Sequence, residues 1–311
     1  MLEFLILAGS LGLLLLAAEA LILGAVALAG RARVSALVIG STVVACGTSM
    51  PELAVMVGSM LTGQTTLGVG TLVGSNITNV LLVVGVPSLI AGGTRTSESF
   101  LPHAAALLGI STVLWFLSWD GSVGTVDGAI LLGFFGFFAV YLAVSLQQVR
   151  KASHRHEQRP AVAEISGLRA LALVLGGIAG LWAGSYAVVP AAVVIAAELG
   201  VPDKAVGIVF LAIGTSLPEL VTATLAAIHR TGGIAVGTVV GSNLFNIGGI
   251  LGGSALFDSV TVEGEVAEFD LPVLVATSVV LMWIAARKGL PSAPAGACLV
   301  GAYLIYAWMQ R

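Results

Sequence analysis

The chain has 311 residues, of which 58% are hydrophobic and only 9% are charged, and its formal net charge is −3. Soluble domains carry about 25% charged and about 45–50% apolar residues. The composition therefore excludes a soluble domain and indicates a polytopic membrane protein in the lipid bilayer. A nucleic-acid partner is disfavoured, because the sequence offers no basic face with interleaved aromatic residues.

Ten apolar stretches are long enough to cross the hydrocarbon core of a membrane as helices, which needs about 20 residues. The first is too long and too weakly cationic at its start for a cleaved signal peptide, so we interpret it as a first span. The sequence thus predicts an all-α polytopic protein with ten transmembrane helices. The predicted spans are 3–29, 35–61, 66–91, 100–118, 127–148, 167–196, 203–228, 232–257, 270–286 and 290–309.

The only sizeable polar segment lies between the fifth and sixth spans. It divides the chain into a first five-helix repeat at residues 1–148, a linker at 149–166 and a second five-helix repeat at 167–311. No span is followed by a soluble domain.

Basic residues predict the orientation of the spans, since cytoplasmic loops carry an excess of Lys and Arg. The loops after odd-numbered spans hold 11 of the 13 Lys and Arg residues. The other side keeps only Lys204 and Arg311, together with an acidic run at 258–270. We therefore expect the 149–166 linker to be cytoplasmic and both termini to lie outside.

A polar motif occurs twice within the apolar spans. Gly-Thr-Ser-x-Pro-Glu stands at 47–52 and again at 214–219, and Gly-Ser-Asn-x-x-Asn stands at 74–79 and 241–246. Aligned at an offset of 167, the two 33-residue segments share 14 identical positions. Because the second and seventh spans are five crossings apart, the copies enter the membrane in opposite directions. Inverted repeats interrupted by Gly and Pro are typical of secondary transporters with a site at the bilayer midplane.

Glu52 and Glu219 fall near the middle of their predicted spans. A charged side chain there costs about 2.5–3.5 kcal/mol on insertion scales, and no Lys or Arg lies in the middle of any span. The partner of each carboxylate is then a bound cation, a proton, or both. The alternative is a pair of permanently protonated, hydrogen-bonded glutamic acids.

Pro51 and Pro218 predict unwound backbone beside the two carboxylates. A proline inside a helix donates no hydrogen bond, which frees the carbonyls of Gly47 and Gly214. Such backbone is tolerated in the membrane only where it lines a cavity or is buried in protein. The alternative is a kink that serves packing alone. The neighbouring carbonyls expected to loosen with them are those of Ala45 and Ala212.

The second motif places a serine and an asparagine four residues apart, on one helix face. These pairs are Ser75 with Asn79 and Ser242 with Asn246. Small polar residues are also common in helix packing within membranes, so packing is the alternative. The asparagines directly after each serine, expected on another face as helix braces, are Asn76 and Asn243.

All of these candidate ligands are oxygen atoms. Hard cations such as Ca²⁺ take six to eight oxygens, and Na⁺ accepts similar groups, whereas softer metals prefer Cys or His. Cys46 and Cys298 have no metal-ligand spacing and do not indicate a disulfide. The four histidines are predicted at loops or span ends and are not expected to be ligands. They are His103, His154, His156 and His229.

At these motifs the sequence resembles the cation/calcium exchanger superfamily, and within it the prokaryotic sodium/calcium exchangers. The resemblance covers nearly the whole chain. It implies an alternating-access antiporter in the cell (inner) membrane of a prokaryote, with Na⁺ and Ca²⁺ as transported ions, no prosthetic group and no enzyme activity. The ion-binding positions that it implies are Ala45, Thr48, Ser49, Glu52, Ser75, Asn79, Ala212, Thr215, Ser216, Glu219, Ser242 and Asn246.

Three features depart from parts of this superfamily. Some members carry Asp at the position of Asn246, which in one branch goes with potassium dependence, so Asn246 argues against K⁺ co-transport. Proton/calcium exchangers usually replace Gly-Ser-Asn by Gly-Asn-Ala, which disfavours H⁺ coupling here. The large calcium-sensing loop of animal exchangers is replaced by about sixteen residues, so built-in calcium regulation is not expected.

The preferred function is therefore Na⁺/Ca²⁺ antiport by a protein that is functional as a monomer. An H⁺/Ca²⁺ antiporter is the alternative in the same class, since buried carboxylates bind protons more readily. A passive cation channel is a second alternative, although channels are more often rings of subunits. An intramembrane enzyme lacks support, because no metal cluster or Ser–Lys pair is present. The role of Glu19, a lone acid in the first span, stays open.

Overall fold

In the computed structural model, the regular secondary structure of the described residues is helical apart from one short two-stranded sheet. The structure describes residues 2–93, 99–152, 165–198, 203–262, 264–287 and 289–310, and within these the side chains of all but 146–152, 196–198 and 203–213. Most of the predicted linker, with His154 and His156, lies outside the described residues, as do Arg311 and the side chain of Lys204.

The first repeat begins with the long helix α1 and contains two π-helical turns, η1 and η2, and one 3₁₀ turn, η3. Its elements are α1 (Leu2–Ala32), α2 (Ala36–Ile39), η1 (Gly40–Val44), α3 (Ala45–Thr48), α4 (Met50–Leu61), α5 (Thr65–Thr78), η2 (Asn79–Val83), α6 (Val84–Ala91), α7 (Leu101–Leu117), η3 (Ser118–Asp120), β1 (Ser122–Val123) and α8 (Thr125–Ala152).

The second repeat follows the same order. Its elements are α9 (Gly167–Glu198), α10 (Asp203–Ile228), α11 (Gly232–Leu244), the π-helical η5 (Phe245–Leu251), α12 (Gly252–Ala255), β2 (Val260–Thr261), the π-helical η6 (Val266–Asp270), α13 (Leu271–Ala286) and α14 (Ala293–Met309). Strands β1 and β2 pair antiparallel and join a loop of each repeat.

The helices agree with the predicted all-α protein of ten spans. In the part of the chain that the structure describes, seven helical stretches are long and apolar enough to cross a membrane, and α2–α3–α4 form an eighth that is bent by 43°. Helix α10, with 26 residues, and the shorter apolar α14, with 17, complete the ten.

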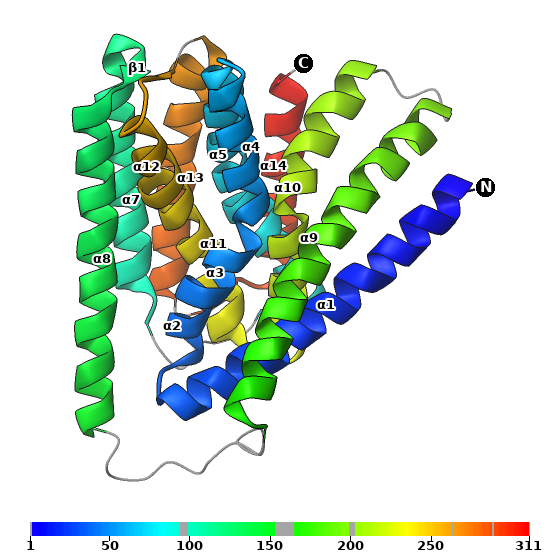
Figure 1. Ribbon diagram of the computed structural model, residues 1–311, viewed down its shortest axis with the longest axis vertical. Coiled ribbons are helices and arrows are strands. Elements are labelled where there is room, and N and C mark those ends of the chain that lie inside the picture. Colours follow the sequence, from blue (N-terminus) through cyan, green and yellow to red (C-terminus); the bar gives the residue numbers. More distant parts are fainter. Residues whose placement is uncertain are drawn as a thin grey trace.

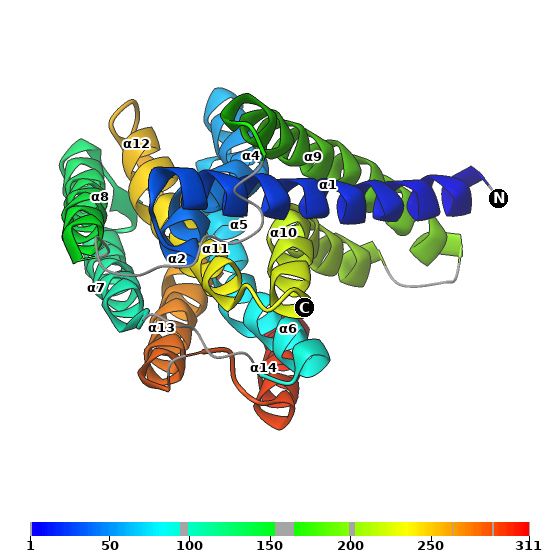
Figure 2. The same cartoon turned by 90° about the horizontal axis from the view of Figure 1, so that it is seen from below.

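Helices α1 and α9 form a separate layer along one side of the molecule (Figures 1 and 2), tilted relative to most of the others. Small residues let their backbones approach. A Cβ on Gly177 would lie 2.7 Å from the backbone nitrogen of Leu21, and one on Gly24 would lie 2.7 Å from the carbonyl oxygen of Ala170. Close approach at small residues is a usual way for helices to associate in lipid.

The helices that carry the second motif lie in the centre of the bundle. In the most apolar 18 residues of the spans 65–91 and 232–255, 83% and 89% of the residues are buried within the protein, against 22% for the same length of α8. On α11, a Cβ at Gly241 would lie 2.5 Å from the Cα of Ser41 on η1. The second motif is thus shielded from lipid on nearly all sides.

The two Gly-Thr-Ser-x-Pro-Glu motifs differ in backbone conformation. In the first repeat α3 ends at Thr48, Ser49 leaves the helix with φ −84° and ψ 11°, and α4 starts at Met50. In the second repeat α10 continues through Pro218 without a break. The predicted interruption is therefore confirmed for the first motif and wrong for the second, where the carbonyl freed by Pro218 receives another donor.

Candidate cation-binding site

Glu219 on α10 is fully buried and receives hydroxyl groups from both repeats. Ser49 donates to its Oε1 at 3.1 Å, and Ser242 on α11 donates to the same oxygen at 3.2 Å. Ser49 is the last residue held by the helical bonds of α3, since its N–H bonds the carbonyl of Ala45 at 3.1 Å, and its ψ of 11° redirects the chain that follows. The bent first motif thus completes the surroundings of the second carboxylate.

Glu52 at the start of α4 is also fully buried. Ser75 on α5 donates to its Oε1 at 2.8 Å and lies 3.0 Å from the hydroxyl of Ser216. Thr215 faces the same carboxylate. The Ser75–Glu52 and Ser242–Glu219 bonds occupy equivalent positions in the two repeats.

The carbonyl oxygen of Ala45 is a third polar centre. The hydroxyl of Thr48 donates to it at 3.3 Å. The hydroxyl of Ser242, whose single proton goes either to Glu219 or to this carbonyl, also lies 3.3 Å from it, and the two hydroxyls are 3.5 Å apart. This carbonyl also accepts the backbone N–H of Ser49 at 3.1 Å, so its helical bond is kept and the expected loosening does not occur. The hydroxyl of Ser242 beside it comes from the other repeat. That the Ala45 backbone contributes an oxygen to a bound ion stays a prediction.

Four asparagines link the repeats across the centre of the molecule. Asn76 donates to the carbonyl of Asn243 at 3.3 Å, and Asn243 donates to that of Asn76 at 3.0 Å. Asn79 donates to the side-chain oxygen of Asn243, and Asn246 to that of Asn76, both at 2.9 Å. The prediction that Asn76 and Asn243 act as braces is confirmed.

Several acceptor atoms of these residues are buried without a hydrogen-bond donor among the described residues. They are Oε2 of both glutamates, the Oδ1 atoms of Asn79 and Asn246, and the hydroxyl oxygen of Thr215. Buried polar groups are normally satisfied. Within the described part of the chain the one salt bridge is elsewhere, so neither glutamate has a basic partner. Unpaired carboxylate and amide oxygens in a dry centre are suited to cations.

The structure thus brings together the predicted positions of both repeats. Of the twelve predicted ligand residues, all except Ala212 take part in the contacts above; Ala212 lies on α10 with its surroundings outside the described residues. His103 is buried on α7, where neither ring nitrogen has a partner among the described residues, and His229 lies at the end of α10, 2.8 Å from Glu19. Neither histidine lies in the site.

One site contact was not predicted. Ser185 on α9 is outside both motifs, and its hydroxyl donates to the carbonyl of Gly214 at 2.5 Å. The available signal was Pro218, which frees that carbonyl, but the sequence does not show which helix supplies a donor.

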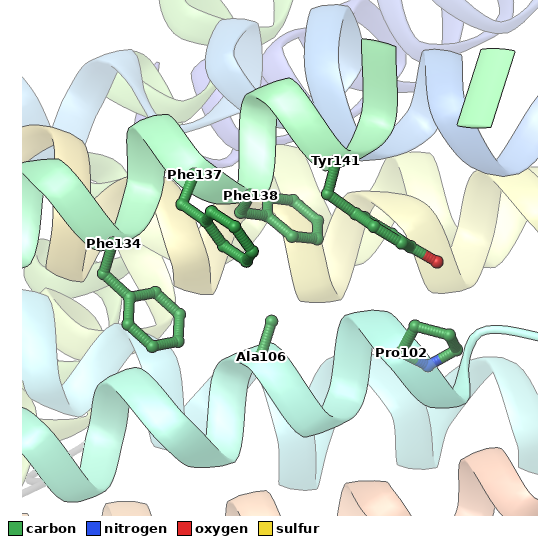
Figure 3. A pocket seen from close by; sticks show the side chains of 6 residues that line it. All are labelled: Pro102, Ala106, Phe134, Phe137, Phe138 and Tyr141. Carbon is green, nitrogen blue, oxygen red and sulfur yellow. The ribbon is translucent and has the colours of Figure 1, made fainter. Parts of the chain in front are cut away.

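A separate groove of about 230 Å³ lies between α7 and α8 (Figure 3). Its lining is almost entirely apolar, with three phenylalanines and a tyrosine of α8 opposite Pro102 and Ala106 of α7. It lacks the oxygen donors that a cation needs, so it is not part of the candidate site.

Two repeats that enclose paired carboxylates and neutral oxygens in the centre of a ten-span bundle define a membrane transporter for cations and not an enzyme. A profile of the family described as "Sodium/calcium exchanger protein" matches residues 2–144 and 169–311. The chain belongs to this family of cation/Ca²⁺ antiporters.

Relatives cover the chain almost completely. It is 30% identical over 322 residues to the "Sodium/calcium exchanger MaX1" of Methanosarcina acetivorans, covering 90% of each chain. It is 31% identical to the "Inner membrane protein YrbG" of Escherichia coli, covering 96% of this chain and 94% of the relative. A solved structure of the sodium-calcium exchanger NCX_Mj, soaked without Na⁺ and Ca²⁺, superimposes with a TM-score of 0.82 at 27% identity and covers 100% of this chain and 99% of its own.

Proposed function

We propose that this antiporter exchanges Na⁺ for Ca²⁺ by alternating access, and that both ions bind at the twelve positions named from the sequence. The observation that carries the proposal is the pair of fully buried carboxylates, Glu52 and Glu219, which have no basic partner among the described residues. An uncompensated pair of charges in a low-dielectric interior is costly, so the carrier requires cations when it closes around them.

The donor set fits Ca²⁺ and Na⁺. Two carboxylates supply the charge that one Ca²⁺ neutralises, and hydroxyls, amide oxygens and the Ala45 carbonyl supply further oxygens toward the six to eight that Ca²⁺ takes. Sodium ions use the same kinds of oxygen. Because the two ions share the carboxylates, they compete, and competition couples their movements.

Sodium is the proposed coupling ion for two reasons. Asn246 stands where an additional acid would offer a further proton site, and its side chain is engaged with Asn76 at 2.9 Å. The relatives MaX1 and NCX_Mj are described as sodium–calcium exchangers. An H⁺/Ca²⁺ antiporter is the second candidate, favoured by the unpaired Oε2 atoms of both glutamates, which a proton would also satisfy.

Calcium uptake into liposomes that contain the purified protein tests the proposal. Vesicles are loaded with Na⁺, and outer Na⁺ and pH are varied independently. Uptake that requires the outward Na⁺ gradient and ignores an imposed pH gradient supports Na⁺/Ca²⁺ exchange. Uptake that follows the pH gradient identifies the proton-coupled alternative, and flux that follows only the Ca²⁺ gradient identifies a channel.

The proposal includes an orientation. Residues 149–166 lie in the cytoplasm in this proposal, between five-helix halves at 1–148 and 167–311, and both termini lie outside the cell membrane. The bias of Lys and Arg toward one side supports this orientation. The relative YrbG is described as an inner membrane protein. Two reporter enzymes inserted after Arg159 test this orientation. A reporter that works only in the cytoplasm should be active, and a reporter that works only outside the cytoplasm should be inactive. The reverse result contradicts the orientation.

A further inference from the structure

A hydroxyl outside the two motifs holds the second one. Ser185 on α9 is 5% exposed, and its Oγ donates to the carbonyl oxygen of Gly214 at 2.5 Å. That carbonyl has no helical donor, because the residue four positions later is Pro218, which lacks an N–H. One turn further along α9, Val189 Cγ2 lies 2.5 Å from where a Cβ of Gly214 would be. Helix α9 is therefore packed directly on this part of α10.

Among the described residues, the first repeat shows no equivalent bond. At the repeat offset of 167, the residue that corresponds to Ser185 is Ala18 on α1, which has no hydroxyl. Pro51 frees the carbonyl of Gly47 in the same way, and the described hydrogen bonds include no side chain that donates to it. The first motif is broken and bent by 43°, whereas α10 runs through Pro218 as one helix.

We propose that Ser185 is a positioning residue that holds the second motif straight and thereby favours the conformation shown here over its opposite-facing counterpart. This inference rests on the proposed alternating-access antiport. Because the repeats are inverted, exchanging their conformations gives the same fold open to the other side of the membrane. In that state α10 bends at its motif and the bond from Ser185 to Gly214 is lost. Ala18 offers no bond in compensation.

The packing of the outer layer agrees with such an exchange. In this structure Ile178 on α9 packs against Gly47 of the first motif. The corresponding contact in the opposite state joins Leu11 on α1 to Gly214. Leu11 is 43% exposed here, so this side chain is free to take up the contact. Helix α9 touches both motifs in one state, and α1 takes its place in the other.

The proposal predicts a change in sidedness. For two states that open to opposite sides, each apparent affinity depends on the population of its own state. Ca²⁺/Ca²⁺ exchange is half-saturated at one Ca²⁺ concentration on each side of the membrane. The ratio of these two concentrations therefore changes by the same factor as the equilibrium constant between the two states. We expect Ser185→Ala to change this ratio by about 2- to 10-fold, as befits one hydrogen bond. Ser185→Thr, which keeps the hydroxyl, should retain the wild-type ratio.

Ala18→Ser is the complementary variant, and it removes no group from the protein. A serine here gives the opposite state the bond that it lacks, so the ratio should move in the same direction as in Ser185→Ala. The double variant should move further than either. This variant also keeps the proposal testable if Ser185→Ala does not fold.

Amide hydrogen exchange of the ion-free protein separates this inference from the proposed function, since it needs no transport. Both Ser185→Ala and Ala18→Ser should speed exchange in residues 214–219 relative to 50–61, and Ser185→Thr should not. If wild-type protein shows no Na⁺-driven Ca²⁺ uptake but these exchange changes occur, the antiport proposal fails and the holding role stands. Unchanged exchange in both variants, or opposite shifts of the sidedness ratio, would overturn the role of Ser185.

Discussion

Glu52 and Glu219 are the residues whose replacement should have the largest effect. Each has one carboxylate oxygen bonded to serine and one unpaired. Unit charges 4 Å apart at an effective dielectric of 20 interact by about 4 kcal/mol, so Glu52→Gln or Glu219→Gln should weaken Ca²⁺ binding by roughly a thousand-fold. At Ca²⁺ concentrations that saturate the wild type, these variants should show neither saturable uptake nor binding in a calorimetric titration.

The fold should survive these substitutions, because glutamine keeps an oxygen that can accept the serine bond and removes a charge that is costly in the membrane. Equal elution on size exclusion and an unchanged thermal midpoint are the controls. Wild-type Ca²⁺ uptake in either variant would disprove the assignment of that carboxylate.

At the scale of helices, the sequence predicted the two motif-bearing pairs but not their different shapes. Gly-Thr-Ser-x-Pro-Glu is present in both copies, so local sequence alone gives the same expectation twice. The outcome differs because Ser185 on α9 satisfies the carbonyl of Gly214, whereas Ala18 cannot do this for Gly47. Contacts between helices that are distant in sequence decide the backbone here, which is why the second interruption was predicted wrongly.

Glycines at helix contacts give a prediction on stability. A Cβ on Gly241 would lie 2.5 Å from both the Cα and the carbonyl oxygen of Ser41, backbone atoms that cannot turn aside. We expect Gly241→Ala to destabilise the protein by about 1–3 kcal/mol, as overpacking does. Gly58 in the interior of α4 has no atom near its virtual Cβ, so Gly58→Ala is the matched control.

Gly58→Ala should be neutral or stabilising by about 0.5–1 kcal/mol, because alanine is the better helix former. Thermal unfolding in detergent measures both variants. Equal midpoints for the two would show that the close contact between α11 and η1 does not limit stability.

The contact between α1 and the end of α10 tests whether Glu19 serves the ion path. Glu19 and His229 lie 2.8 Å apart, with side chains 41% and 44% exposed. Exposed pairs contribute about 0–1 kcal/mol. We therefore expect Glu19→Gln to change the half-saturating Ca²⁺ concentration by less than about 3-fold, in contrast to Glu52→Gln. A larger change in the same uptake assay would place Glu19 on the ion path.

For the whole molecule, the repeat offset of 167 predicted the symmetry well. Residues separated by this offset contact one another, as Asn76 does with Asn243 and as the hydroxyl of Ser111 does with that of Ser278 at 3.2 Å. What the offset does not give is the state of the carrier. In two inverted copies either motif can be the bent one, and the repeated motifs alone do not indicate which of the two states a structure shows.

The charge of the closed carrier leads to a last prediction. The candidate site holds two acidic residues, Glu52 and Glu219. An acidic residue introduced at Asn246 would add a third negative charge to the site. With ionised Glu52 and Glu219, one bound Ca²⁺ gives a site of zero net charge, which crosses the membrane field without electrical work. Ca²⁺/Ca²⁺ exchange should therefore be insensitive to a potential imposed with K⁺ and valinomycin. Asn246→Asp adds a negative charge when ionised, and one charge moved through the field is worth about 2.3 kcal/mol per 100 mV. At alkaline pH the rate of Ca²⁺/Ca²⁺ exchange by this variant should depend on voltage by up to roughly 50-fold per 100 mV.

Voltage-dependent Ca²⁺/Ca²⁺ exchange in the wild type would show instead that the Ca²⁺-loaded carrier has a net charge, and that a group outside these two carboxylates moves with it.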